Sequence, residues 1–314
     1  MSRIGVNPAK NYSEMRAGSV LRVIIPVYIP NHEGYFKDSF HIFKLCLDSL
    51  HRNKSFKLAI TIVLNHCAKD IIDFCLKERE IGNIDDLIIL NSNVGKVNAI
   101  LKGVAGSDAE LFLITDADVL FLNNFDDVIY KYFENRSSGF LGLQPVYGKA
   151  SYLTSWTRLK LWGRLKNITP NEMDIFENVR FQKSIGNDKA FELKKLSFVN
   201  INGIECVLGS GHFCFASHRS SFMNLPGWNT EFLISKGSER IFLDEPSFYT
   251  GLLRLSVRYS VALHMGNTLE PWMFKIANDS GLVEKNVAEI VVRIPSREWR
   301  IMPKFILKLI EKIF

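Results

Sequence analysis

The first half of the chain alternates short apolar runs with stretches of helical periodicity. The apolar runs, rich in β-branched residues, predict buried strands at 21–27, 58–64, 87–90 and 111–114. Between them, apolar residues recur at helical spacing over 38–51, 70–81 and 96–104. Strands that are apolar throughout and alternate with helices predict a mostly parallel α/β sheet covered on both faces. Ligands of such sheets bind beyond the carboxyl ends of the strands.

The second half of the chain has a less regular pattern. After Pro145 the alternation stops, and residues 147–205 mix basic and aromatic residues. Strands are predicted again at 207–216 and 257–264, with a helix at 246–255 between them. With no repeat and no linker, we expect one domain over residues 20–292, after a loose polar arm at 1–19 and before a C-terminal segment at 293–314.

Composition excludes several classes of protein. With 314 residues, 47% of them hydrophobic, the chain can bury a large core, and it is neither disordered nor of low complexity. The five cysteines form no CxxC pair, so core thiols in a reducing compartment are expected. No stretch resembles a signal peptide or reaches the ~18 apolar residues of a membrane span, so a cytoplasmic location is expected.

Most of the net charge of +6 lies at the C-terminus. From Arg293 to Phe314 there are six basic and two acidic residues, a net charge of +4. This distribution argues for one basic element and against a nucleic-acid groove. Arg300, Lys304, Lys308 and Lys312 share one helical face opposite apolar residues. The segment therefore predicts an amphipathic helix, either peripheral on an anionic membrane surface or docked on the core with its basic face in solvent.

Two carboxylates follow the fourth predicted strand. Asp116 and Asp118 come directly after the apolar strand predicted at 111–114. They are therefore expected at the edge of the sheet where ligands bind. Burying two anions there is costly without a counter-charge, and Mg²⁺ or Mn²⁺ prefers such hard oxygen ligands. The alternative is a strand-end turn with two solvated side chains.

Further motifs occur in a fixed order along the chain. They are Val23–Tyr28, Asn93–Ala99, Asp116–Asp118, Gly209–Ala216, Leu243–Pro246 and Val261–His264. Together they resemble the GT-A glycosyltransferases, most closely the inverting family-two branch, over about residues 20–267. The resemblance implies a GT-A fold, a Rossmann-like, mostly parallel sheet with helices on both faces. It also implies that the domain consists of a nucleotide-binding half, 20–125, and an acceptor half, 126–292.

The resemblance also implies which residues hold the donor. Pro26, Val27 and Tyr28 match the border of the nucleobase, and Asn65 stands where the family has an acidic residue facing the base. The full implied donor set is Pro26, Val27, Tyr28, Asn65, Asn93, Gly95, Lys96, Asp116, Gly209 and Gly211. The implied metal ligands are Asp116, Asp118 and His264.

The pair Asp244–Glu245 matches the acidic pair that supplies the proton acceptor, in reversed order. Which of the two is the base stays open. If neither is, Glu205 or Glu239 is the next candidate for the base. The other reading of Asp244 is a helix N-cap before Pro246. His212 lies in the segment that begins with Gly209 and Gly211, called the glycine loop below. For this histidine a structural role is favoured over contact with the acceptor.

The sequence thus predicts a metal-dependent inverting glycosyltransferase that uses Mn²⁺ or Mg²⁺. Its donor would be a nucleotide-sugar, with a UDP-sugar as first candidate, and its acceptor a glycan or lipid-linked hydroxyl in bacterial surface polysaccharide synthesis. No nucleic-acid partner is expected. The absence of GxGxxG, GxxxxGK[ST] and GxSxG motifs argues against dehydrogenases, P-loop enzymes and serine hydrolases. A sugar-phosphate nucleotidyltransferase and a non-catalytic, membrane-bound binding subunit are the alternatives.

Overall fold

The computed structural model describes most of the predicted domain. The described residues are 21–134, 138–145, 152–168, 175–184, 196–222, 225–233, 237–246 and 250–279, together with Leu309. The predicted arm at 1–19 lies outside them. Of the predicted C-terminal helix at 293–314 only Leu309 is described, in helical conformation and with 58% of its surface exposed.

The first half folds as the hydrophobic pattern predicts. Strands and helices alternate in the order β1 (Arg22–Val27), α1 (Ser39–Asn53), β2 (Ala59–Asn65), α2 (Lys69–Glu80), β3 (Asp86–Leu90), α3 (Lys96–Ala105) and β4 (Leu111–Thr115). Every boundary lies within two residues of the range expected from the sequence. The β-branched runs form strands because their side chains pack well on a pleated, buried surface.

Smaller elements make up the rest of the described chain. Its strands are β5 (Val119–Phe121), β6 (Ser138–Gly142), β7 (Lys166–Ile168), β8 (Leu196–Ile201), β9 (Ile204–Leu208), β10 (Cys214–His218), β11 (Leu253–Val257) and β12 (Ala262–His264). Its helices are α4 (Phe125–Phe133), α5 (Tyr152–Lys160), α6 (Ile175–Ser184) and α8 (Pro271–Asp279), with 3₁₀ turns η2 (Gly34–Phe36) and η4 (Arg219–Phe222) and a π-helical turn η5 (Arg240–Asp244).

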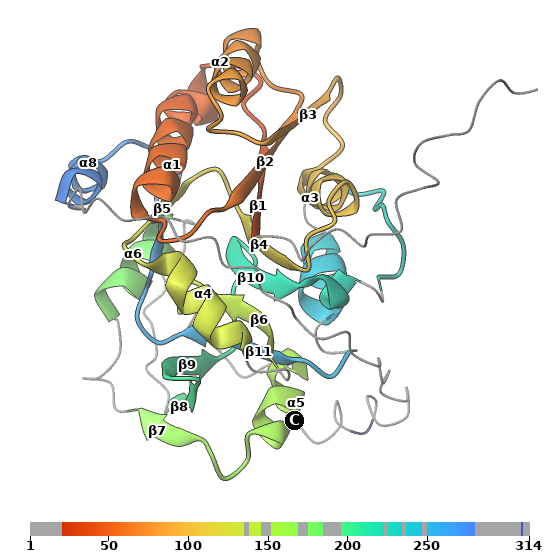
Figure 1. The fold of residues 1–314 in the computed structure, drawn as a ribbon, viewed down its shortest axis with the longest axis vertical. Coiled ribbons are helices and arrows are strands. Elements are labelled where there is room, and N and C mark those ends of the chain that lie inside the picture. The colour runs from red at the N-terminus through yellow and green to blue at the C-terminus, as the bar shows by residue number, and fades with distance from the viewer. Residues whose placement is uncertain are drawn as a thin grey trace, which may run out of the picture.

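One large sheet runs through the described chain. Its ten strands lie in the order β3-β2-β1-β4-β10-β6-β11-β9-β8-β7, from the top to the bottom of Figure 1. Strands β3, β2, β1 and β4 are parallel, whereas β10 pairs antiparallel with both β4 and β6. Since β11 is parallel to β6, most strands share one direction, and the predicted α/β class is confirmed. The separate pair β5–β12 is antiparallel.

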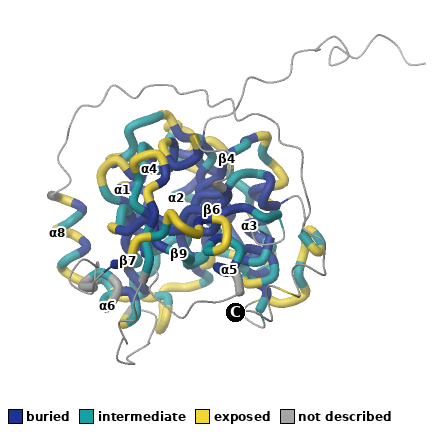
Figure 2. Tube along the Cα trace, turned by 90° about the horizontal axis from the view of Figure 1, so that it is seen from below, coloured by how far each residue is buried: buried dark blue, intermediate teal, exposed yellow. Residues whose placement is uncertain are grey.

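Helices cover both faces of the parallel part of the sheet. In Figure 1, α1 and α2 lie on one side of β1 and β2 and α3 lies on the other. Alternate residues of β1 divide between two cores: Val23 and Ile25 pack in one cluster with α1, and Ile24 packs in the other with α3. The central strands are accordingly buried, and exposed residues gather at the periphery (Figure 2).

Three predictions for the second half differ from the structure. Of the predicted helix at 246–255, Pro246 is helical and 247–249 lie outside the described residues, but the end of the range belongs to the buried strand β11, Leu253–Val257. The single strand predicted at 207–216 is instead the end of β9, a loop at 209–213 and the start of β10. The predicted strand at 257–264 is represented only by the last residue of β11 and the short β12. Apolar composition did not distinguish helix from strand in these short segments.

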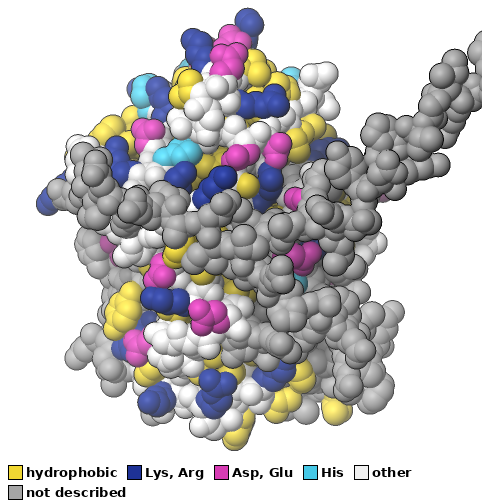
Figure 3. Space-filling model, viewed as in Figure 1, with side chains coloured by type: hydrophobic (Ala, Val, Ile, Leu, Met, Phe, Trp, Pro, Cys, Tyr) yellow, Lys and Arg dark blue, Asp and Glu magenta, His cyan; other side chains and the backbone are white. Residues whose placement is uncertain are grey.

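The surface and the thiols fit the sequence analysis. All five cysteines are free, and four of them are buried, as expected of core thiols. Among the described residues of the face in Figure 3, basic and acidic side chains are interspersed. No helix within the described ranges has the length and apolar character needed to cross a membrane. The proposed division at residue 125 stays a prediction, and the large sheet is continuous across it.

Candidate active site

A cavity of about 260 Å³ opens at the carboxyl ends of β1, β2 and β4. Strands that run parallel bring these ends to one edge, as expected for ligand sites in α/β sheets. Nine residues predicted from the sequence line it, namely Pro26, Val27, Tyr28, Asn65, Asn93, Gly95, Lys96, Asp116 and Asp118. Gly209, Gly211, Asp244, Glu245 and His264 are not among its lining residues.

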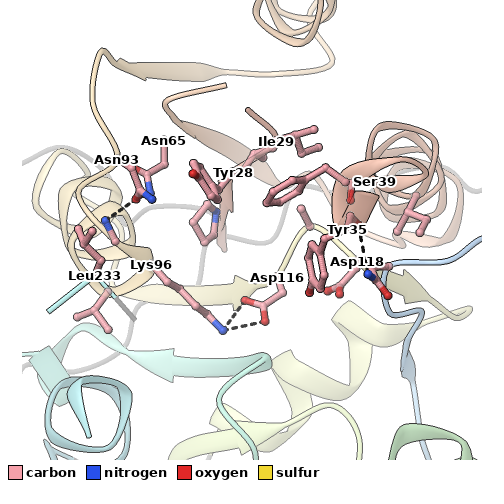
Figure 4. A pocket seen from close by; sticks show the side chains of 18 of the residues that line it. Tyr28, Ile29, Tyr35, Ser39, Asn65, Asn93, Lys96, Asp116, Asp118 and Leu233 are labelled. Atoms are coloured by element: carbon pink, nitrogen blue, oxygen red, sulfur yellow. Dashed lines mark hydrogen bonds and ion pairs between the residues drawn. The ribbon is translucent and has the colours of Figure 1, made fainter. Parts of the chain in front are cut away.

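Lys96 and Asp116 form an ion pair across the cavity. The Lys96 ammonium lies 2.7 Å from each carboxylate oxygen of Asp116 and 3.7 Å from Glu239 Oε1 (Figure 4). Burial lowers the pKa of Lys96, but the surrounding carboxylates, Asp116 first, outweigh burial and raise it. Lys96 is therefore a fixed positive charge in the first turn of α3, where the helix dipole also favours anions.

Asp118 and His264 are held together by strand pairing. In the β5–β12 ladder His264 lies opposite Val119, and the backbone N–H of Met265 donates to the Asp118 carbonyl at 2.7 Å. His264 Nε2 is 3.4 Å from Asp118 Oδ2, and the imidazole packs edge-on against Phe181 and Phe213. The rings fix the orientation of this histidine relative to the carboxylate.

The second carboxylate oxygen of Asp118 has no partner in the described structure. Oδ1 is buried and makes no hydrogen bond. Burial and the neighbouring Asp116 raise the pKa of Asp118, while His264 and Lys96 oppose them. A buried carboxylate oxygen without a donor is costly for a protein and is the kind of atom that a cation satisfies.

The predicted metal ligands fit a cation only with help from a substrate. Within the described residues there is no group of three His, Cys, Asp or Glu side chains that could hold a metal ion. Asp118 and His264 supply two ligands, whereas Asp116 is paired with Lys96. Mg²⁺ and similar ions are commonly held by one or two carboxylates together with substrate phosphates. The residues therefore fit a cation shared with a phosphorylated ligand.

Asn65 builds a turn beside the cavity. Its Oδ1 accepts the backbone N–H of Val94, and its Nδ2 donates to Asn93 Oδ1, which also accepts the N–H of Gly95. Gly95 has φ +86°, and a Cβ there would lie 2.5 Å from the Leu233 carbonyl oxygen, so only glycine fits. The amide of Asn65 thus sets the entry to α3, in addition to lining the cavity.

Aromatic side chains line the other end of the cavity. Tyr28 packs edge-on against Phe36, and Phe36 against Tyr35, with ring centroids 5.5 and 5.1 Å apart. Tyr35 lies beside Asp118 in Figure 4 and is 69% exposed. Burial of the hydroxyl, and then Asp118 and Asp116, raise the pKa of Tyr35. Sequence analysis missed Tyr35 because a residue in a turn after β1 shows no periodic pattern.

A second group of charges adjoins the cavity through Glu239, which lines it. Asp244 lies in η5 and is bound to Arg254 of β11, with Oδ1 2.6 Å from the guanidinium Nη2. Asp244 is therefore inside a helical turn, and its interpretation as a helix N-cap is wrong. Glu245 lies 3.3 Å from Arg240 Nε, and Glu205 pairs with Arg258 at 3.0 Å.

The glycine loop is tied to the same arginine. Arg254 Nη2 donates to the Ser210 carbonyl at 2.8 Å, and Gly209 has φ +93°, which favours glycine. The next residues carry His212 to within 3.4 Å of Asp244. Two tryptophans of the second half do not line the cavity: Trp156 donates to the Gly251 carbonyl, and Trp162 is 76% exposed.

Comparison with known proteins gives structural matches alone. No protein-family model matches the sequence, and no curated protein matches it. Among solved structures, S. aureus TarS matches with a TM-score of 0.44 and 13% identity over 82% of this chain and 38% of that chain. S. aureus TarS 1-349 in complex with UDP-GlcNAc matches with a TM-score of 0.34 and 15% identity over 43% of this chain and 38% of that chain. The mannosyltransferase PcManGT from Pyrobaculum calidifontis, in complex with GDP-Man and Mn²⁺, matches with a TM-score of 0.45 and 14% identity over 78% of this chain and 56% of that chain. The matched region spans less than two thirds of the length of each of these proteins.

Proposed function

We propose that this protein is a metal-dependent inverting glycosyltransferase of the GT-A type. The observation that carries the proposal is the cavity itself. Nine of the residues that the family resemblance assigns to donor or metal meet around one space, although they come from four separate segments of the chain. The chemistry of that space suits a nucleotide-sugar.

Each part of a nucleotide-sugar has a matching region. Tyr28 and Tyr35 offer aromatic faces to the base, while Lys96 and the N-terminus of α3 offer positive charge to a diphosphate. Asp118, with its unpartnered oxygen, and His264 would hold Mn²⁺ or Mg²⁺ against the diphosphate. When bound, that cation would stabilise the negative charge on the departing nucleoside diphosphate.

The remaining requirement is a proton acceptor beside the attacking hydroxyl. The family resemblance points to the pair Asp244–Glu245 for this role, and Asp244, with His212, belongs to the group of charges that adjoins the cavity through Glu239. We further propose a glycan or lipid-linked acceptor in bacterial surface polysaccharide synthesis. The basic segment at 293–314 would then hold the enzyme at the inner face of an anionic membrane, where such an acceptor lies.

The donor site can be tested by thermal unfolding of the full chain with UDP-GlcNAc, UDP-glucose or GDP-mannose, with and without Mn²⁺. A ligand at 100 times its Kd stabilises the folded state by about 2.7 kcal/mol. With ~2.1 cal/mol/K of unfolding entropy per residue, this corresponds to a rise of about 4 °C in Tm for 314 residues.

We expect one of these donors to raise Tm when Mn²⁺ is present and Asp118→Ala to lose that rise. Asp127→Ala is the matched control, because Asp127 pairs with Lys131 on α4, away from the cavity. An equal donor-dependent rise in wild type and Asp118→Ala would place the site elsewhere. Metal-dependent binding without any turnover would favour the non-catalytic binding subunit.

A further inference from the structure

His212 lies between two carboxylates at the edge of the donor cavity. Its Nδ1 is 3.4 Å from Asp244 Oδ2, and its Nε2 is 3.9 Å from Glu239 Oε1. About a third of the side chain, 36%, is exposed. His212, like Asp244, is not itself a lining residue of the cavity; its Nε2 approaches Glu239, which lines the cavity beside Lys96.

Asp244 is poorly placed to accept a proton from a substrate. Its side chain is 11% exposed and does not line the cavity, and its Oδ1 is bound to Arg254, whose side chain is 3% exposed. Burial raises the pKa of Asp244, but the hydrogen bond from His212 and the charge of Arg254 outweigh burial and lower it. A carboxylate with a lowered pKa is a weak general base.

The other acidic candidates are also engaged or distant. Glu245 lies 3.3 Å from Arg240, is 13% exposed and does not line the cavity. Glu205 belongs to β9 and pairs with Arg258. Glu239 does line the cavity, where it faces both Lys96 and His212. Among the described groups near Glu239, the His212 side chain is more exposed than that of Asp244, at 36% against 11%, and it has a carboxylate beside each ring nitrogen.

We infer that His212 is the proton acceptor of the transfer reaction and that Asp244 orients it. The inference rests on the proposed glycosyltransferase function. A carboxylate that accepts the Nδ1–H of a histidine fixes the tautomer that leaves Nε2 free to take a proton. Asp244 is then a positioning residue, and the acidic pair identified in the sequence contributes to catalysis through the histidine of the glycine loop.

The proposed step balances as a single displacement. The acceptor oxygen forms a bond to the anomeric carbon, and the bond from that carbon to the donor diphosphate breaks. Its electron pair stays on the diphosphate oxygen, and the hydroxyl proton passes to His212 Nε2. The resulting imidazolium lies between Asp244 and Glu239, which stabilise its charge, and its exposed edge returns the proton to solvent.

One buried arginine sets this geometry. Arg254 binds both Asp244 Oδ1 and the Ser210 carbonyl, and its guanidinium also lies over the Phe140 ring, 4.0 Å from the centroid. The same side chain thereby fixes the carboxylate and the loop that carries His212. The Arg254 side chain thus holds together two segments that are distant in sequence, 209–212 and 240–244.

The test measures nucleoside diphosphate release from UDP-GlcNAc and GDP-mannose with Mn²⁺, with water or an added acceptor as nucleophile. His212→Gln is expected to lower kcat by ~10²–10⁴, the usual contribution of a general base, without changing the donor Kd by more than about twofold. His212→Gly is expected to regain part of its kcat in added imidazole, which a purely structural role would not produce. Asp244→Asn should lower kcat while leaving the donor Kd unchanged.

His218→Gln is the matched control. His218 also lies near a carboxylate, 3.6 Å from Glu110, but at the opposite end of β10 from the cavity. This variant should keep wild-type turnover, and thermal unfolding of every variant checks that it folds.

The inference is overturned if His212→Gln keeps turnover within about threefold of wild type. It is also overturned if His212→Gly folds but imidazole restores nothing, or if Glu239→Gln or Glu245→Gln alone carries the full loss. A wild-type chain that releases no nucleoside diphosphate from any donor contradicts the proposed function itself, and the inference with it.

Discussion

Replacing Arg254 by glutamine removes the charge that holds the glycine loop and η5 together. Arg254 is 2% exposed, and its guanidinium lies 2.6 Å from Asp244 Oδ1. The substitution takes this positive charge away from the buried Asp244 carboxylate, which keeps its contact with His212. Two unit charges about 4 Å apart attract by about 4 kcal/mol at an effective dielectric constant of 20. Breaking a buried pair by removing one partner likewise costs about 3–5 kcal/mol.

This loss should be visible as a drop in Tm. With ~2.1 cal/mol/K of unfolding entropy per residue and 314 residues, 3–5 kcal/mol corresponds to about 5–8 °C. The assay is differential scanning calorimetry of wild type, Arg254→Gln, Asp244→Asn and the double variant. Because both side chains serve one contact, we expect the double variant to lose clearly less than the sum of the two single losses.

The pH dependence gives a second readout of the same contact. In the folded chain the pKa of Asp244 is lowered, against about 3.9 unfolded. A lowered carboxyl pKa stabilises the fold above the unfolded value and loses that effect as pH falls through the folded value. The deficit of Arg254→Gln should therefore be largest near neutral pH and shrink below about pH 4. Additive losses, or a Tm drop under about 1 °C at pH 7, would refute this account of Arg254.

Four further predictions concern the site, the thiols and the C-terminal segment. Asp118→Asn should abolish the Mn²⁺-dependent rise in Tm with donor but leave the Tm of the metal-free protein equal or higher, because it removes a buried charge with an unpartnered oxygen; a lower metal-free Tm would contradict this. Gly95→Ala should cost about 1–3 kcal/mol by urea denaturation and weaken donor binding, since φ is +86° and the new Cβ would meet the Leu233 carbonyl; unchanged stability would contradict the contact. Thiol-reagent labelling of the native chain at pH 8 should be slow, because burial raises the pKa of Cys67 to about 11 and raises the pKa of each of the other cysteines; rapid labelling of any cysteine before unfolding would contradict it. A chain that ends at Arg293 should stay folded but no longer sediment with anionic vesicles, while the full chain sediments and is released by high salt; unfolding of the truncated chain would show that the segment is structural.

The parallel half of the fold was predictable because its elements are specified locally. Leu111–Thr115 is buried at every position, so a continuous apolar run was sufficient to identify β4. Asp116 and Asp118 were expected at the ligand-binding edge because they follow a buried parallel strand, whereas the other predicted lining residues of the cavity, Lys96 included, came from the family resemblance. Asp116 and Lys96, which are twenty residues apart, were both predicted and do meet there.

The arrangement around Asp244 was not predictable in the same way because it depends on non-local pairing. Strand β11 carries a buried arginine in place of an apolar residue, and Asp244 lies in the π-helical turn η5. His212 reaches Asp244 only because β10 runs antiparallel between β4 and β6, and β11 pairs with β6. Neither the register of these strands nor the role of Arg254 is visible in hydrophobic periodicity.

The measurement that tests the central claim most directly is the stereochemistry of sugar transfer. The full chain is incubated with Mn²⁺ and each of the three α-linked donors UDP-GlcNAc, UDP-glucose and GDP-mannose, and proton NMR follows the anomeric signals of the first product formed. The account predicts release of the nucleoside diphosphate from one donor, a first product of β configuration, and no reaction when Asp118 is replaced by alanine. A first product of α configuration would contradict the inverting displacement, and the absence of nucleoside diphosphate release from every donor would contradict the assignment of this cavity to glycosyl transfer.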